Sequence, residues 1–142
     1  MHTNSITNRK TLKFLMSYVY NFNTFKEITK KQTYMISENF TFIKTDKKLV
    51  KLYFNEITVI KGLGNYVVIQ TTENKKYIYY KSLKDLIENL PNEFMRVHNS
   101  HIVNLTNIDV LEDNHIIIKN VKVAVGKSYK ECLNSAINKY ML

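Results

Sequence analysis

The chain has 142 residues, with 21 Lys and Arg against 12 Asp and Glu, which gives a formal net charge of +9 at pH 7. A hydrophobic content of 44%, with ten Tyr and seven Phe, is enough to build a core and excludes intrinsic disorder for most of the chain. Its single Cys excludes a scaffold stapled by internal disulfides, and no apolar run reaches membrane-spanning length. These exclusions leave a cytoplasmic protein, not a membrane protein, as the expectation, and the basic balance favours an anionic partner such as nucleic acid.

Residues 1–39 differ in composition from the rest and carry six basic and two acidic side chains. Two short apolar groups at helical spacing, within 12–19 and 22–28, predict one or two weak helices. A segment this short cannot bury much core alone, so it either packs on the rest of the chain or stays mobile. We therefore expect a short helical N-terminal appendage or linker at 1–39 and a separate domain at 40–142.

From residue 40 onward, short runs rich in β-branched and aromatic residues alternate with turn-forming residues, which is typical of a mostly β domain. The first two runs flank the polar residues 45–47 and predict a hairpin. Before Tyr66, the residues Gly62, Gly64 and Asn65 are expected to supply the positive-φ positions of a tight turn. The predicted strands are 40–44, 48–54, 57–61, 66–71, 76–81, 101–105, 107–111, 115–119 and 121–125.

Two short helices are predicted within this β domain. The first covers 81–91, with Ser82 as its N-cap and Pro91 as its end. The second begins at Ser128, where Glu131 completes an S-x-x-E capping box. Its apolar stripe has steps of three and four and predicts one buried face, in which Cys132 is a small buried hydrophobe. The stripe consists of Tyr129, Cys132, Leu133, Ala136, Ile137, Tyr140 and Met141.

The sequence contains no catalytic constellation. His98 and His101 are separated by two residues, which in an extended chain places their rings on opposite faces, and no Cys or paired carboxylate lies nearby at metal-ligand spacing. The G-x-G at 62–64 lacks the third Gly and the following helix of a dinucleotide site. We therefore expect neither an enzyme nor a bound metal or cofactor.

The segment 96–104 concentrates polar side chains around three aliphatic residues. At a loop-to-strand junction, such a cluster can form several hydrogen bonds to duplex DNA. The alternative is a polar loop whose side chains cap their own backbone, and composition alone leaves both interpretations open. The polar residues are Arg96, His98, Asn99, Ser100, His101 and Asn104.

The order of these signals resembles the LytTR DNA-binding domain, which is found at the C-termini of many bacterial response regulators. The resemblance rests on ITVIKGLGNYVVIQT at 57–71, YYKSLKDLIENLPNEFMRVHNSHIVNLTNI at 79–108 and VKVAVGKSYKECL at 121–133. It implies small antiparallel sheets with short helices at their edges. It also implies that loops, not a recognition helix, bind duplex DNA and reach two successive major grooves.

The resemblance places base contacts in three loops of this chain. The matching positions are Tyr66 or its neighbour Asn65, then Asn99, then Lys127. Asn can pair with adenine and Lys with guanine acceptors. Residues expected beside them, or in contact with phosphate, are Arg96, His98, Ser100, Ser128 and Lys130.

Four positions depart from what is common in the family. Asn99 stands where Arg is frequent, and His101 stands where an aromatic residue is frequent. Gly126 and Lys127 replace a common Ser-Arg pair, which removes a hydroxyl and a bidentate guanidinium fork. DNA binding is still expected, and the preferred DNA sequence is left open.

The expected function is a sequence-specific transcriptional regulator that binds double-stranded DNA as a homodimer or as paired copies on repeated sites. Family members commonly carry a phosphorylatable receiver domain, for which 1–39 is too short. Because 21–31 resembles the last helix of a receiver running into its linker, the appendage is expected to be a remnant or truncated part of a two-component response regulator. The alternative function is a protein-interaction module of the same fold that no longer binds DNA.

Overall fold

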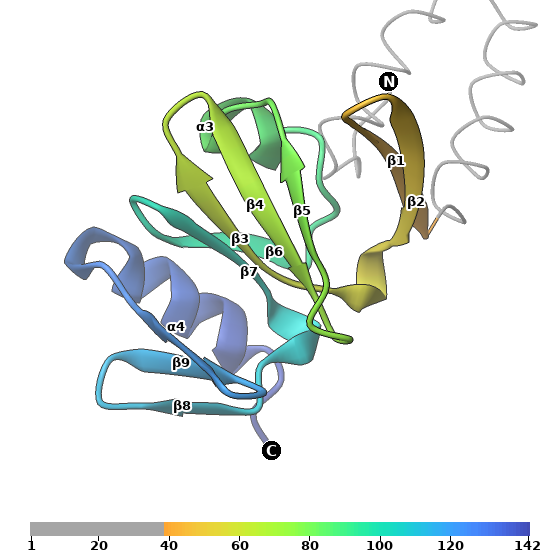
Figure 1. Cartoon of the computed structure of the whole chain (residues 1–142). Helices are drawn as coiled ribbons and strands as arrows, with labels where there is room; N and C mark the ends of the chain where they lie inside the picture. Colours follow the sequence, from red (N-terminus) through yellow and green to blue (C-terminus); the bar gives the residue numbers. More distant parts are fainter. Residues whose placement is uncertain (1–38) are drawn as a thin grey trace, which may run out of the picture. The chain divides into compact units, whose positions relative to one another are not determined.

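The computed structural model describes residues 39–142, so the helices expected within 1–39 lie outside the described residues. Residues Phe40–Leu142 form one compact unit of antiparallel sheets and short helices (Figure 1). The mostly β fold with small antiparallel sheets and short helices, predicted from the sequence, is confirmed for this part of the chain.

Three antiparallel sheets make up the described unit. The first is the hairpin of β1 (Phe40–Thr45) and β2 (Lys48–Tyr53). The second has the strand order β5-β4-β3-β7-β6 and consists of β3 (Ile57–Leu63), β4 (Tyr66–Thr71), β5 (Lys76–Tyr79), β6 (Phe94–His98) and β7 (His101–Asn104). The third consists of β8 (Val110–Glu112), β9 (His115–Ile118) and β10 (Val121–Ala124). Helix α3 (Leu83–Ile87) connects β5 to β6, and α4 (Lys130–Asn138) follows β10.

The five-stranded sheet separates two apolar clusters. Because successive side chains of a strand point to opposite faces, the paired Ile60 and Ile102 belong to one cluster and the paired Val59 and Val103 to the other. The first cluster also contains buried residues of the β1–β2 hairpin and of α3. The second contains buried residues of β9, β10 and α4, which lie together on one side of the sheet in Figure 1. Strands β3 and β7 are therefore buried on both faces, which sets their place at the centre of the fold.

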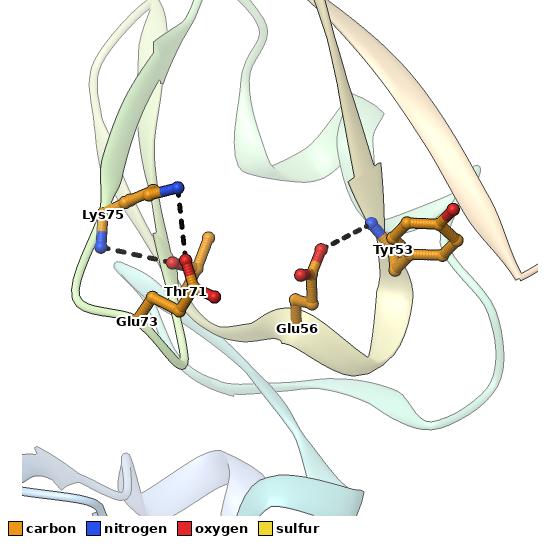
Figure 2. Close-up of polar contacts among 5 residues, drawn as sticks. All are labelled: Tyr53, Glu56, Thr71, Glu73 and Lys75. Atoms are coloured by element: carbon orange, nitrogen blue, oxygen red, sulfur yellow. Dashed lines mark hydrogen bonds and ion pairs between the residues drawn. The ribbon is translucent and has the colours of Figure 1, made fainter.

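Local polar contacts shape the end of the sheet where β4 turns into β5 (Figure 2). The amide of Tyr53 donates to Glu56 Oε1 at 3.1 Å, and the amide of Lys75 donates to Thr71 Oγ1 at 3.2 Å. The Lys75 ammonium lies 3.2 Å from Glu73, whose hydrogen bond and charge raise the pKa of Lys75. The exposed ion pair contributes little stability. The main effect of these contacts is therefore on the local geometry of the turns.

The turn after β3 differs from its prediction. Strand β3 continues through Gly62 and Leu63, and of the three residues expected to have positive φ only Gly64 does, at 70°. Gly62 is needed for space, because a Cβ built there would lie 2.6 Å from Leu83 Cδ1. The prediction that Gly62 and Asn65 supply positive-φ positions was therefore wrong.

Helix α3 is shorter than its pattern predicted. The hydroxyl of Ser82 accepts a hydrogen bond from the amide of Asp85 at 3.2 Å, which confirms Ser82 as the N-cap. The helix ends at Ile87, well before Pro91, because the next turn tightens into a bond from the amide of Asn89 to the carbonyl of Leu86 at 3.0 Å. Pro91 therefore does not end this helix.

Helix α4 begins two residues later than predicted. Ser128 lies inside a 3-10 turn at Lys127–Tyr129, and the residue before the helix, Tyr129, makes no side-chain cap. The expected capping box is absent because its Ser lies inside the 3-10 turn and is not the residue that precedes the helix. Leu133 is buried as predicted, whereas Cys132 is exposed, so its predicted burial was wrong. Only a narrow side of α4 packs on the second cluster.

Candidate nucleic-acid interface

The loops that carry the predicted base-contacting residues lie at one end of the five-stranded sheet. The first loop is the Gly64–Asn65 turn with Tyr66, the second is the Asn99–Ser100 turn, and the third is 126–129. The first two share an end because β3 finishes where β7 begins, with Lys61 paired to His101. In Figure 1 the β6–β7 turn and the start of α4 lie on the same side. We call this surface the three-loop edge.

The second loop is the tip of a hairpin that the sequence did not predict. Residues Phe94–His98 form strand β6, whereas a loop-to-strand junction was expected over 96–104. The chain reverses at Asn99 and Ser100, so His98 and His101 become cross-strand neighbours with ring centroids 5.3 Å apart. The prediction that these rings lie on opposite faces was wrong, because it assumed an extended chain between them. Within residues 39–142 no three His, Cys, Asp or Glu side chains are grouped to hold a metal ion.

Hydrogen bonds join the loops of this edge. The amide of Gly62, next to the first loop, donates to the carbonyl of Ser100 in the second loop at 2.8 Å. The amide of Gly126 in the third loop donates to the carbonyl of Val97 at 2.7 Å. The Tyr129 hydroxyl donates to Oδ1 of Asn99 at 3.1 Å, which connects the third loop to the second through side chains. The third loop is therefore bonded to the second loop and to β6, and the second loop is bonded to the end of β3, from which the first loop extends.

Arg96 and His98 stabilise the second loop from within. Arg96 Nη2 donates to the carbonyl of Asn99 at 2.6 Å, a charge-assisted hydrogen bond, and the amide of Ser100 donates to Nδ1 of His98 at 3.1 Å. The Asn99 side chain is exposed at the tip. These contacts match the interpretation of a polar loop that caps its own backbone, and they leave the Asn99 amide nitrogen at the surface as a donor.

His101 is half-buried beside the second loop. Burial, together with the charges of His98 and Lys61, lowers the pKa of His101 below its ordinary value. Its Nδ1 is buried and has no hydrogen-bond partner within the described part of the chain. The neutral form of His101 is therefore favoured over its charged form.

The first loop presents an amide and an aromatic pair. Asn65 is exposed, and Tyr66 is partly buried with its ring centroid 5.7 Å from that of Tyr80. Tyr80, which is 77% exposed, was not among the predicted site residues. The β4–β5 register, in which Val67 faces Tyr79, brings Tyr80 beside Tyr66. Pairing the predicted strands 66–71 and 76–81 in this register would have placed Tyr80 beside Tyr66 and so predicted it as a site residue.

The third loop carries the remaining predicted residues. Lys127 and Ser128 are exposed in the 3-10 turn before α4. Lys130, half-buried at the start of α4, lines a small cleft together with Glu112 and Asp113 of the β8–β9 turn. Lys127 thus belongs to the three-loop edge, and Lys130 follows the third loop directly and also lines the cleft beside the β8–β9 turn.

Tyr129 has a polar role that its sequence pattern left out, and Asn104 has the backbone-bonding role that the alternative interpretation of the polar cluster allowed. Tyr129 was assigned to the apolar stripe of the last helix, but its hydroxyl reaches Asn99, and a half-buried phenol normally needs such a partner. Asn104, part of the polar cluster, is fully buried and donates to the carbonyls of Phe54 and Ile57 at 3.0 and 3.1 Å. Asn104 therefore satisfies buried backbone groups and is not part of the edge.

Comparisons with known proteins agree with this architecture. The family model described as LytTr DNA-binding domain matches residues 47–138, more than half of the chain. The fold is similar to the solved LytTr DNA-binding domain of a response regulator from Bacillus cereus, with a TM-score of 0.62 and 20% identity, covering 71% of this chain and 98% of that chain. A search of curated proteins finds no match. No helix within residues 39–142 is long and apolar enough to cross a membrane. From the extent of the family match and the shared fold, the chain belongs to the LytTR family of DNA-binding domains.

Proposed function

We propose that this chain is a sequence-specific transcriptional regulator that reads duplex DNA with the three-loop edge. In this proposal Asn65 or Tyr66, Asn99 and Lys127 contact bases in successive major grooves. The observation that carries it is the hydrogen bonding around the second loop, which joins Ser100 to Gly62 at the end of β3 and Asn99 to Tyr129 of the third loop. A surface that is already ordered loses less conformational freedom when it binds.

The side chains of the edge suit two kinds of DNA contact. Asn amides and Lys ammonium groups can form hydrogen bonds with base edges in the major groove. Hydroxyl, imidazole, guanidinium and ammonium groups near them can hold phosphate oxygens and fix the register on the duplex. We assign the second role to Arg96, His98, Ser100, Ser128 and Lys130. The net charge of +9 adds sequence-independent attraction. The proposed activity requires no catalysis and no cofactor.

The proposal includes paired copies on repeated sites. One small module contacts few base pairs, which limits its affinity and specificity, and a second copy on a neighbouring half-site adds to both. We further propose that 40–142 is the DNA-binding domain, that 1–39 is an appendage or linker, and that the protein works in the bacterial cytoplasm as part of a two-component system.

A randomised duplex pool tests the proposal. The purified chain is incubated with the pool at near-physiological salt, and the retained duplexes are sequenced. We expect an enriched motif that occurs as a spaced repeat, and we expect its loss in a variant carrying Asn65→Ala, Asn99→Ala and Lys127→Ala that still folds. Retention of duplexes without an enriched motif, or no retention, would contradict sequence-specific regulation.

The alternative is a protein-interaction module, and it is favoured by exposed apolar side chains on the β1–β2 hairpin. Phe42 and Leu49 are 54% and 68% exposed. Salt dependence separates the two functions, because each DNA phosphate neutralised by the protein lowers the slope of log affinity against log salt by about 0.9. The regulator is expected to lose duplex binding steeply between low and moderate salt and to keep it in Phe42→Ser. Absence of duplex binding at low salt would favour the interaction module.

A further inference from the structure

We propose that Tyr129 is a positioning residue that fixes the orientation of the Asn99 amide, so that Asn99 contacts DNA as a hydrogen-bond donor and favours guanine over adenine. This inference rests on the proposed function and concerns one base pair of the recognition site. Its basis is the hydrogen bond from the Tyr129 hydroxyl to Asn99 Oδ1, 3.1 Å long, between residues that are 30 positions apart in the chain.

A primary amide has two ends of nearly equal shape, an acceptor oxygen and a donor NH₂ group. On an exposed turn, backbone geometry does not decide which end faces a ligand. In this chain the backbone of Asn99 is held by Arg96, which donates to its carbonyl at 2.6 Å, and the side-chain oxygen is held by Tyr129. Together these contacts leave the two N–H groups of Asn99 for an outside partner.

The approach of Tyr129 depends on Gly126. A Cβ built on Gly126 would lie 2.9 Å from Cδ2 of the Tyr129 ring, closer than carbon atoms normally approach. Gly126 has φ of −67°, which any residue adopts, so the glycine is required by the neighbouring ring and not by the backbone conformation. Gly126, Tyr129 and Asn99 therefore act as one unit in which the first residue gives the second its position.

The orientation of the amide changes which base fits. A bidentate contact to adenine needs both ends of the amide, with the oxygen accepting from N6 and the nitrogen donating to N7. An amide whose oxygen is held by Tyr129 instead offers two donor hydrogens, and guanine presents two acceptors, N7 and O6, on the same edge. The structure thus favours guanine where an unrestrained Asn favours adenine.

The test is a parallel selection from a randomised duplex pool with the wild type, Asn99→Ala and Tyr129→Phe. The base pair whose preference Asn99→Ala relaxes is the one that Asn99 contacts. We expect guanine at this base pair in the wild type, and a guanine-to-adenine ratio about fivefold lower in Tyr129→Phe, the change that loss of one hydrogen bond produces. The other base pairs of the motif should keep their preferences, which a general loss of structure would not allow.

The possible outcomes separate this inference from the function on which it rests. A wild type that enriches no motif contradicts the proposed function and this inference together. An enriched motif in which Asn99→Ala relaxes a base pair that Tyr129→Phe leaves unchanged contradicts this inference alone. Selection of adenine at that base pair by the wild type also overturns it.

A second measurement reports on the free protein. Tyr129→Phe keeps the ring and removes the hydroxyl, so NMR is expected to show a shift of the Asn99 side-chain NH₂ signals and no change in melting temperature. Gly126→Ala should shift the same signals, because it displaces the ring. Tyr140→Phe is the matched control, since Tyr140 lies just beyond the other end of α4 and is 79% exposed. Unchanged Asn99 signals in Tyr129→Phe would overturn the positioning role.

Discussion

The amide of Gly62 donates to the carbonyl of Ser100 at 2.8 Å and joins the end of β3 to the turn between β6 and β7. The same glycine leaves room for Leu83 of α3, so one residue connects the candidate interface to the first apolar cluster. Packing of α3 and the geometry of the second loop are therefore coupled through Gly62.

Gly62→Ala is expected to destabilise the domain. The added methyl group would lie 2.6 Å from Leu83 Cδ1, and overpacking of this kind costs about 1–3 kcal/mol. Urea unfolding of the single variant measures the loss. The double variant Gly62→Ala, Leu83→Ala should lose less than the sum of the two single variants, because the smaller side chain makes room. Additive losses would show that the two positions are not coupled.

Asn104→Ala is expected to cost more than a surface substitution. Its side chain bonds the carbonyls of Phe54 and Ile57 and also accepts from the amide and hydroxyl of Thr106. Removing it takes four hydrogen bonds out of the fold, with an expected loss of about 2–3 kcal/mol of unfolding free energy. Asn107→Ala, which removes two hydrogen bonds from a less buried side chain, is the matched control and should cost less. Equal losses would contradict this role.

Most strands were predictable because their β-branched residues are contiguous, as in β3, β9 and β10. Strand β6 was not, and its burial pattern gives the reason. Its buried residues Phe94 and Val97 are three positions apart, because a register shift lies between Arg96 and His98, so the alternation expected of a strand is missing. The polar residues in between were then interpreted as a loop.

The candidate site was predictable only in part. The resemblance to a family assigned base contacts to Asn65 or Tyr66, Asn99 and Lys127, whereas the residues alone indicated only a polar cluster at 96–104. The bonds from Gly62 to Ser100 and from Tyr129 to Asn99 join residues far apart in sequence, and no local pattern encodes them. The spacing of Tyr129 within the apolar stripe of the last helix predicted packing, and it gave no sign that the hydroxyl bonds a residue 30 positions away.

Asn99→Ala and Lys130→Ala are expected to affect DNA binding differently. Loss of Asn99 should relax the preference at one base pair by about 1–3 kcal/mol with a modest loss of overall affinity. Lys130→Ala should weaken selected and scrambled duplexes alike, as expected for a phosphate contact. Titrations of both variants with both duplexes measure the difference. Equal effects of the two substitutions on every duplex would contradict these roles.

Stability should fall as the pH drops through the mid-range, and His101 should account for part of the fall. Its pKa in the folded chain lies below the ordinary 6.5, because burial, His98 and Lys61 disfavour the charged ring. Below pH 6.5 the unfolded chain therefore binds a proton that the folded chain does not, until the pH reaches the lower folded pKa. Urea unfolding at pH 7.5 and 5.5 should show a smaller difference in His101→Gln than in the wild type. An unchanged difference would contradict this account.

The most direct test of the central claim is an NMR titration of the ¹⁵N-labelled chain with the duplex selected from the randomised pool, at near-physiological salt. The account predicts that the backbone amides of Asn65, Asn99 and Lys127 shift first and most, with those of the β1–β2 hairpin unchanged. Shifts confined to the β1–β2 hairpin, or spread evenly over all exposed Lys residues, would contradict recognition of DNA by the three-loop edge.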